Sequence, residues 1–263
     1  VTDKRVGFFS FIGSAGVGWM LRSKLAPGTR CGLEHGGVAP VIVAKDADVA
    51  GALPALAKGA FYHAGQVCVS VQRIFAHESI AKKLANGLAR EAKAMKVGDP
   101  TKATTDVGPL IRPGEVDRVD EWVQEAKAGG AKELSGGKRL SKTCYPPTVL
   151  YDPPAKARVS TNEVFGPVVC VYPYRNIDQA IKRANSLDVS FQAAVFTGDL
   201  DTAAHCYRQL DASAVMVNDH TAFRVDWMPF AGLRHSGHGV GGIHHTMHEM
   251  QIEKMMVLKS SAL

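Results

Sequence analysis

The chain has 263 residues, 46% hydrophobic and 21% charged, enough for one large domain or two small ones with a sizeable core. Its net charge of +6 comes from scattered lysines and arginines, without the clustered basic and aromatic residues typical of nucleic-acid binding. No apolar run has membrane-spanning length, and five widely spaced cysteines without a CxxC pair argue against a disulfide scaffold and a cysteine zinc site. We therefore expect a cytoplasmic protein with reduced thiols that binds neither nucleic acid nor membranes.

Strand-like and helix-like segments alternate along the chain. The first are a strand at 5–13, a helix at 14–25, and strands at 29–37 and 39–44, the last apolar enough for burial on both faces. The later expected segments are helices at 47–62, 78–95, 115–128, 177–187 and 199–210, and strands at 71–77, 146–152, 166–174, 191–197 and 213–219. This alternation predicts an α/β fold with a mostly parallel sheet and helices on both faces.

Three further stretches complete the expected organisation. Residues 96–115 form a long connection rich in glycine, proline and threonine, and residues 128–140 are rich in turn-forming residues. Residues 251–260 predict a C-terminal edge strand. Val1, directly before an expected strand, leads us to expect a start inside a larger protein.

Cys68 is the first candidate for chemistry. It lies in "FYHAGQVCVSVQRIFAH", between an expected helix and an expected strand, and Gly65 allows a turn that exposes the thiol to a cleft. A nucleophilic cysteine needs a thiolate supported by backbone N–H groups or a base. From the residues alone, a buried structural thiol is the commoner alternative.

Glu34 is the second candidate, because "GLEHGG" places its carboxylate at the end of an apolar strand. Open α/β sheets bind ligands at the carboxyl ends of their strands, and a half-buried glutamate there can act as a general base. An ordinary surface carboxylate at a strand end is the alternative.

Two loops could contact a cofactor. "FIGSAGVG" joins a strand to a helix whose free N–H groups suit a pyrophosphate, although the order G-x-x-G-x-G differs from GxGxxG. In "TNEVFGPVV", Glu163 could hold a sugar hydroxyl and Phe165 could face a planar ring. A plain turn and a structural loop are the alternatives.

Histidines gather near the C-terminus, where His244 and His248 are spaced to share one face of a helix. No carboxylate or cysteine joins them in a strong ligand pattern, so we expect no metal site.

Taken together, these motifs resemble the aldehyde dehydrogenase superfamily, in family order over almost the whole chain. The matching segments are "FIGSAGVG", "LEHGGVAPVIVAKDAD", "HAGQVCVSVQRIFAH", "VGDP…TDVGPLI", "NEVFGPVV", "AAVFTGDL" and "MPFAGLRHSGHG". The resemblance implies an aldehyde dehydrogenase-like catalytic domain in which Cys68 is the nucleophile and Glu34 activates the deacylating water. The Cys68 backbone N–H would supply half of an oxyanion hole.

By the same resemblance the cofactor is NAD or NADP. Gly13, Ser14 and Val17 would lie along its pyrophosphate and adenosine, and His35, where leucine is usual, would lie at the nicotinamide. Glu163 and Phe165 would contact the nicotinamide ribose and ring.

The resemblance also implies a division of the chain. Residues 1–36 would be the last piece of a Rossmann-like cofactor domain, 37–236 the catalytic domain, and 237–263 a C-terminal tail with an oligomerisation strand. The expected whole enzyme is a homo-oligomer, a dimer or a tetramer. Because most of the cofactor domain precedes this region in the family, we expect weak cofactor binding by this chain alone.

The segment "NDHTAFRVDWMPFAG" resembles the subgroup acting on small or anionic aldehydes, such as lactaldehyde, succinate semialdehyde, glyceraldehyde 3-phosphate and phosphonoacetaldehyde. Arg224 could clamp an acidic substrate, with an ordinary surface arginine as the alternative. Val67 stands where phosphate-selective relatives often carry arginine, which disfavours doubly charged substrates. Two other functions stay open: a catalytically silent folding and oligomerisation fragment, and a cysteine-dependent esterase or hydrolase.

Overall fold

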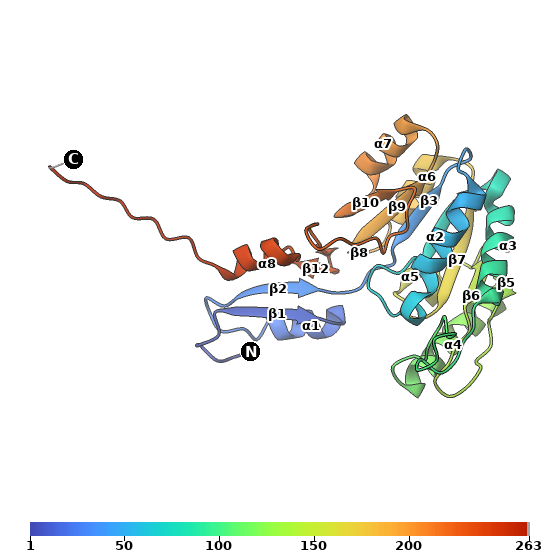
Figure 1. Ribbon diagram of the computed structural model, residues 1–263, viewed down its shortest axis with the longest axis horizontal. Helices are drawn as coiled ribbons and strands as arrows, with labels where there is room; N and C mark the ends of the chain where they lie inside the picture. Colours follow the sequence, from blue (N-terminus) through green and yellow to red (C-terminus); the bar gives the residue numbers. More distant parts are fainter. Residues whose placement is uncertain (262–263) are drawn as a thin grey trace.

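A computed structural model describes residues 1–261 and contains two main β-sheets joined through the connection between β2 and β3 (Figure 1). The larger sheet has the order β10-β9-β3-β4-β7-β6-β5. Its strands are β3 (Pro40–Val43), β4 (Arg73–His77), β5 (Lys132–Ser135), β6 (Thr148–Tyr151), β7 (Val168–Tyr174), β9 (Gln192–Phe196) and β10 (Ala214–Val217). All neighbours pair in parallel except β5, which runs antiparallel to β6 at one edge. The predicted mostly parallel α/β fold is therefore confirmed.

Helices cover both faces of this sheet. The described helices are α1 (Ala15–Arg22), α2 (Val49–Phe61), the short η1 (Tyr62–Gly65), α3 (Glu78–Ala94), α4 (Pro113–Ala128), α5 (Arg158–Thr161), α6 (Ile177–Ala184), α7 (Leu200–Gln209) and α8 (Ile243–Met250). On one face, Phe75 of β4 stacks on Tyr172 of β7, and Arg183 of α6 lies over both rings. Because successive side chains of a strand point to opposite faces, Ile74 faces the other side, where α2 and α3 pack against each other (Figure 1).

The core lies between the sheet and these helices. Strands β3 and β9 are buried at every position, as expected for central strands of a parallel sheet. Helix α3 packs one apolar stripe against this core: Leu84, Leu88 and Ala92 are buried, and Ile80 packs partly against it.

Asp48 caps the N-terminus of α2, and its side chain accepts a hydrogen bond from the Ala50 N–H. Asp46 accepts hydrogen bonds from the Thr197 hydroxyl and the Gly198 N–H, and so ties the end of β3 to the end of β9.

The smaller sheet contains β1 (Phe8–Ile12), β2 (Arg30–Glu34) and β12 (Gly237–His238) in the order β1-β2-β12. Strands β1 and β2 are parallel, whereas β12 returns from the C-terminal region to pair antiparallel with Leu33 and Glu34. The segment predicted as a separate tail therefore completes the sheet of the N-terminal segment. A third, two-stranded pairing joins β8 (Val189–Ser190) to β11 (Leu233–Arg234).

Two expectations from the sequence were wrong. Residues 251–260, predicted as an edge strand, form no strand; they extend away from the body of the molecule (Figure 1). Within residues 1–261 they have no neighbouring strand, and a strand requires such a neighbour for its backbone hydrogen bonds. Conversely, the turn-rich stretch 128–140 contains β5. No helix within residues 1–261 is long and apolar enough to cross a membrane.

Candidate active site

A cavity of about 660 Å³ collects most of the predicted site residues, and its volume is typical of small-molecule sites. It is lined by the β1–α1 turn, the end of β2, the loop before β4, helix α4 and the loop before β7. The predicted residues in its lining are Gly13, Ser14, Glu34, His35, Cys68, Glu163 and Phe165. Val17 and Arg224 are not in the lining.

Cys68 follows a sharp reversal of the chain at the end of α2. His63, Ala64 and Gly65 all have positive φ, at 50°, 56° and 69°, so η1 turns the chain out of the helix. The Ser70 N–H then donates to the Val67 carbonyl at 3.0 Å, which closes a turn around Cys68. The thiol is therefore held on a loop between a buried helix and a buried strand.

Gln66 holds this loop in place, a role that was not predicted from the sequence. Its side-chain amide donates to the Pro109 carbonyl at 3.3 Å and its oxygen accepts from the Ile111 N–H at 2.9 Å. These bonds tie the Cys68 loop to the end of the long 96–115 connection. The available signal was its place in "GQVC", two residues before Cys68.

The Cys68 thiol is protonated at neutral pH. Burial is the largest cause that raises its pKa, to about 11, and the charges of Glu163 and Glu34 raise it further. Its own backbone N–H and that of Val69 act in the opposite direction, so both donors lie near the sulfur. These donors could also stabilise an oxyanion formed on a carbon bonded to that sulfur.

Glu163 is the most buried acid of the cavity. Burial raises its pKa to about 7, against the opposing effects of the Gly37 N–H and Arg118. Its Oε1 is buried and has no hydrogen-bond partner among the described residues. A Cβ at Gly36 would lie only 1.9–2.0 Å from this carboxyl group, so glycine is required there for Glu163 to occupy its place.

The loop that carries Glu163 is held by the buried Gln72 at the start of β4. The Gln72 amide donates to the Val159 and Asn162 carbonyls at 3.0 and 2.7 Å, and its oxygen accepts from the Val164 N–H at 2.9 Å. Phe165 adopts a positive φ of 46° and leaves its ring partly exposed in the cavity. Sequence reasoning missed Gln72, because only the folded chain brings the two segments together.

Helix α4 supplies one wall of the cavity, which was also not predicted. Arg118 donates to the Val164 carbonyl at 2.7 Å and to Glu115 at 2.8 Å, and its guanidinium lies 4.7 Å from the centre of the Trp122 ring. Arg118 and Trp122 are four residues apart and so share one helix face. That spacing was the only sequence signal for this wall.

Glu34 ends β2 at the meeting point of β1 and β12. Its carbonyl accepts from the Gly13 N–H at 3.1 Å, and a Cβ at Gly241 would lie 2.1 Å from its Oε1. Burial raises the pKa of Glu34, while Arg224 lowers it. Arg224 is exposed, donates to the Met228 carbonyl at 3.2 Å and lies 4.5 Å from the centre of the Phe230 ring. Arg224 therefore acts on the cavity electrostatically, through Glu34.

The β1–α1 turn is held by His35. The buried imidazole packs near Phe11 and Trp19, and its Nδ1 lies 2.9 Å from the Gly13 carbonyl, which it can reach only as an N–H donor. The opposite nitrogen, Nε2, is buried and has no partner among the described residues. Ser14 occupies the N-cap of α1 without a side-chain hydrogen bond, which leaves the first N–H groups of the helix open.

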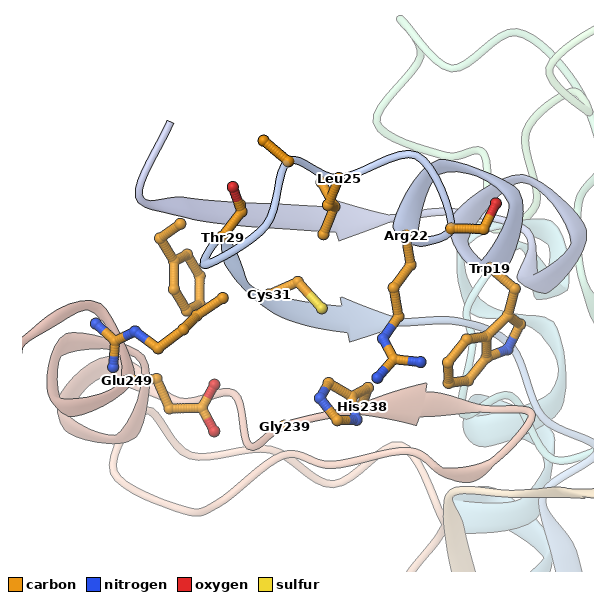
Figure 2. A pocket seen from close by; sticks show the side chains of 12 residues that line it. Trp19, Arg22, Leu25, Thr29, Cys31, His238, Gly239 and Glu249 are labelled. Atoms are coloured by element: carbon orange, nitrogen blue, oxygen red, sulfur yellow. The ribbon is translucent and has the colours of Figure 1, made fainter. Parts of the chain in front are cut away.

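A second cavity, of about 740 Å³, lies beside α1 and contains none of the predicted catalytic residues (Figure 2). Cys31 of β2 points into it, and Arg22, His238 and Glu249 also line it. The C-terminal histidines do not gather around a common point: His238 lines this cavity, whereas the centre of the His244 ring lies 3.9 Å from that of the His245 ring in α8, with the rings tilted by 38°. Within residues 1–261, no group of three or more His, Cys, Asp or Glu side chains could hold a metal ion.

Alkylation of Cys68 by iodoacetamide should speed up about tenfold per pH unit below its pKa of about 11, because the thiolate is the reacting form. Glu163→Gln removes a nearby negative charge and should raise the rate at about pH 8. Peptide mapping by mass spectrometry measures the rate at Cys68 separately from that at Cys144. A rate at Cys68 that does not change from neutral pH to about pH 9 would contradict this assignment.

Gly65→Ala should destabilise the loop that carries Cys68. A left-handed backbone costs a non-glycine residue about 1–3 kcal/mol, and the new Cβ would also lie 2.1 Å from the Gly166 carbonyl oxygen. Urea denaturation of the chain measures the loss in the free energy of unfolding. Gly114→Ala is the control, because its Cβ would meet nothing within 4 Å and alanine favours the helix there. Equal stability of the two variants would refute the prediction.

Known proteins share the sequence pattern and the fold of this chain. A family model described as "Aldehyde dehydrogenase family" matches residues 1–256. The 3-sulfolactaldehyde dehydrogenase of Priestia megaterium is 41% identical over 256 residues, which are 97% of this chain and 53% of that protein. The lactaldehyde dehydrogenase of Methanocaldococcus jannaschii is 39% identical over 258 residues, 98% of this chain and 55% of that protein.

Among solved structures, the glyceraldehyde-3-phosphate dehydrogenase GapN of Methanocaldococcus jannaschii, complexed with NADP, matches with a TM-score of 0.91 and 39% identity. The match covers 95% of this chain and 54% of that one. The chain thus spans about half the length of the relatives it matches. On the family match over nearly its whole length, the chain belongs to the aldehyde dehydrogenase family.

Proposed function

We propose that this chain forms the catalytic part of an NAD(P)-dependent dehydrogenase that oxidises a small aldehyde to its carboxylate. The observation that carries the proposal is the shared cavity of Cys68, Glu34 and Glu163, which combines a thiol, a half-buried carboxylate and a buried carboxylate. The family match supports the reaction class. Because the chain spans about half of its relatives, the activity is proposed for the intact protein.

The residues around the cavity fit a dinucleotide. The open N–H groups at the start of α1 suit a phosphate, with Gly13 and Ser14 in the adjoining turn. Glu163 has an unpaired Oε1 that could accept a ribose hydroxyl, and Phe165 offers a partly exposed ring. His35 would support the turn from beneath, and Val17 would face the adenosine side. When bound, the oxidised nicotinamide accepts a hydride, and its positive charge favours the Cys68 thiolate.

Cys68 would perform the first covalent step. Its thiolate adds to the aldehyde carbon and forms a thiohemiacetal, whose oxyanion the Cys68 N–H can stabilise. A bound nicotinamide would accept the hydride of that carbon, and the role of Cys68 would be to hold the oxidised acyl group as a thioester. The raised pKa of Cys68 supports a thiol that stays inactive until its surroundings change.

Glu34 would act in the second step. It takes a proton from water, the resulting hydroxide attacks the thioester carbon, and the carboxylate product leaves as Cys68 regains its proton. Burial raises the pKa of Glu34, which makes its carboxylate a stronger base than an exposed glutamate. Arg224 acts in the opposite direction, because its positive charge favours the ionised carboxylate.

The substrate proposed is a small aldehyde, with an anionic head favoured. Arg224 is the candidate contact for that head. Within residues 1–261 its guanidinium donates only one hydrogen bond, to the Met228 carbonyl, so its other N–H groups are available to an anion. The printed names of the relatives, 3-sulfolactaldehyde and lactaldehyde dehydrogenase, support small substrates.

A panel of aldehydes assayed with NAD+ and NADP+ on the intact protein tests this function. Lactaldehyde, 3-sulfolactaldehyde, succinate semialdehyde and glyceraldehyde 3-phosphate form the panel. Arg224→Gln should raise KM for the anionic aldehydes and leave KM for a neutral aldehyde unchanged. Absence of reduced cofactor with every aldehyde would overturn the proposal and favour a catalytically silent folding fragment.

A cysteine hydrolase is less well supported. His35 is the histidine in the cavity lining, but its ring packs against α1, where a Cβ at Gly18 would lie 2.4 Å from Nε2, and among residues 1–261 it makes no hydrogen bond to Cys68. Ester hydrolysis by the intact protein without cofactor, at a rate comparable to aldehyde oxidation, would favour that alternative.

We also propose that the intact protein is a homo-oligomer in the cytoplasm. The side chains of Ile252, Met255 and Val257 are 83–84% exposed on the extended C-terminal segment, and apolar side chains in such numbers suit a partner surface. Sedimentation of the intact protein and of a variant ending at residue 250 tests this. Equal mass for both would count against a role of this segment in assembly.

A further inference from the structure

A small cavity of about 90 Å³ lies on the α6 face of the larger sheet, separate from the proposed active site. Its lining includes Arg73 and Phe75 of β4, Ser160 of α5, Tyr172 of β7 and Arg183 of α6. By the same measure a single water molecule needs only about 10–15 Å³. The cavity can therefore hold an ion of several atoms.

Arg73 is buried, with 4% of its surface exposed, and its hydrogen bonds are incomplete. One terminal nitrogen donates to the Ala184 and Arg183 carbonyls, at 2.7 and 3.2 Å, at the end of α6; the other reaches the Ser160 carbonyl at 3.5 Å. The Nε–H is buried without a partner among the described residues. An unpaired donor on a buried charged group is costly, which makes it a candidate for a ligand contact.

Arg183 brings a second positive charge to the same cavity. Its guanidinium carbon lies 5.1 Å from the centre of the Phe75 ring and 5.2 Å from that of Tyr172. The Arg73 guanidinium lies 5.3 Å from the same Phe75 ring. Within residues 1–261 the Arg183 side chain makes no hydrogen bond and no ion pair, so its donors are unused.

No carboxylate balances these two charges. Burial is the largest cause that lowers the pKa of Arg73, to about 10, and Arg183 lowers it further, whereas Tyr172 and Cys170 act in the opposite direction. No Asp or Glu contributes to this shift, and none pairs with either arginine among the described residues. Arg73 still carries its proton at neutral pH. The positive charges of Arg73 and Arg183 therefore both lie near the Phe75 ring and both line the cavity.

We propose that this cavity binds a small inorganic oxyanion, such as phosphate or sulfate, between the guanidinium groups of Arg73 and Arg183. The Arg73 Nε–H and the unused Arg183 N–H groups would donate to its oxygens, in charge-assisted hydrogen bonds that guanidinium groups form well with oxyanions. The ion would join the start of β4 to the end of α6, and it would bind whether or not the chain takes part in aldehyde oxidation.

Calorimetric titration of the 263-residue chain with inorganic phosphate, at constant ionic strength and neutral pH, tests the proposal. We expect saturable binding of one phosphate per chain, and binding at least tenfold weaker for Arg183→Gln. Lys182→Gln is the matched control, because it removes one positive charge from the neighbouring, exposed position of the same helix. It should bind phosphate as the unaltered chain does.

A second measurement separates site binding from general salt effects and from misfolding. Phosphate should raise the Tm of the unaltered chain and of Lys182→Gln by more than it raises that of Arg183→Gln, because a ligand that binds only the native state stabilises it. Circular dichroism establishes that each variant is folded. No saturable heat with the unaltered chain, or equal affinity of the folded Arg183→Gln variant, would overturn the proposal.

Discussion

Replacing Cys68 with alanine should abolish aldehyde-dependent formation of NAD(P)H by the intact protein, lowering turnover by more than about a thousandfold. Cys68 carries the one thiol in the lining of the cavity that also holds Glu34 and Glu163, within the described part of the chain. Alanine removes the sulfur. It does not remove the hydrogen bonds of Gln66, which hold the loop in place. Initial rates, together with cofactor binding measured by fluorescence, test this expectation.

Cys144→Ala is the matched control, because its thiol is also only partly buried but lies outside the cavity lining. This control should retain turnover. Near-normal turnover of the Cys68 variant would remove the thiol from the mechanism. Loss of cofactor binding along with turnover would instead point to a structural role of Cys68 in the loop.

Glu34→Gln should lower steady-state turnover by about a hundredfold to ten thousandfold while a first burst of NAD(P)H, stoichiometric with enzyme, remains. The carboxylate is assigned to hydrolysis of the thioester, which follows hydride transfer, so its loss should trap the acylated Cys68. Glutamine preserves the shape that packs against Gly241. Rapid-mixing kinetics and the mass of the trapped adduct measure both effects.

Glu115→Gln is the control carboxylate for this experiment. Glu115 lines the same cavity, but hydrogen bonds from Arg118 and Arg112 lower its pKa, which makes it a weak base. It should change turnover far less than Glu34→Gln. Loss of the burst in the Glu34 variant would show that Glu34 acts before hydride transfer, contrary to its assignment.

The main features of the fold were predictable because they depend on local patterns. The buried strands β3 and β9 are continuous apolar runs, and α3 repeats its apolar residues at helical spacing. A strand covered on both faces needs apolar residues at every position, and a helix covered on one face needs them at helical spacing. The order of motifs around Cys68, Glu34 and Glu163 likewise predicted residues that the folded chain brings into one cavity.

Other features depend on contacts between distant segments and could not be read from local patterns. Strand β5 has the sequence "KELS", whose residues favour helices as much as strands; its pairing with β6 decides its conformation. Residues 251–260 were predicted as a strand but are not one, since no described strand lies beside them to pair with their backbone.

The arrangement of the site also depends on contacts between segments that are distant in sequence. The Arg224 guanidinium lies outside the cavity lining, over Phe230, and its contact with a substrate stays a prediction. Val17, in the first turn of α1, is exposed outside the lining, and its contact on the adenosine side of the cofactor stays a prediction. The glycine at 241, which makes room for the Glu34 carboxylate, is far from it in sequence, and only the folded chain reveals the contact.

The pairing of β12 with β2 has a consequence for how the molecule folds. Glu34 and Gly237 are direct partners across this pairing, so the chain between them must close a loop of about two hundred residues. Contacts of such long sequence separation form slowly, and the larger sheet can assemble without them. Pulse-labelled hydrogen exchange during refolding should therefore protect β3 and β9 before β2. The base of the proposed reaction would then be the last part of the site to reach its place, held there by residues from the far end of the chain.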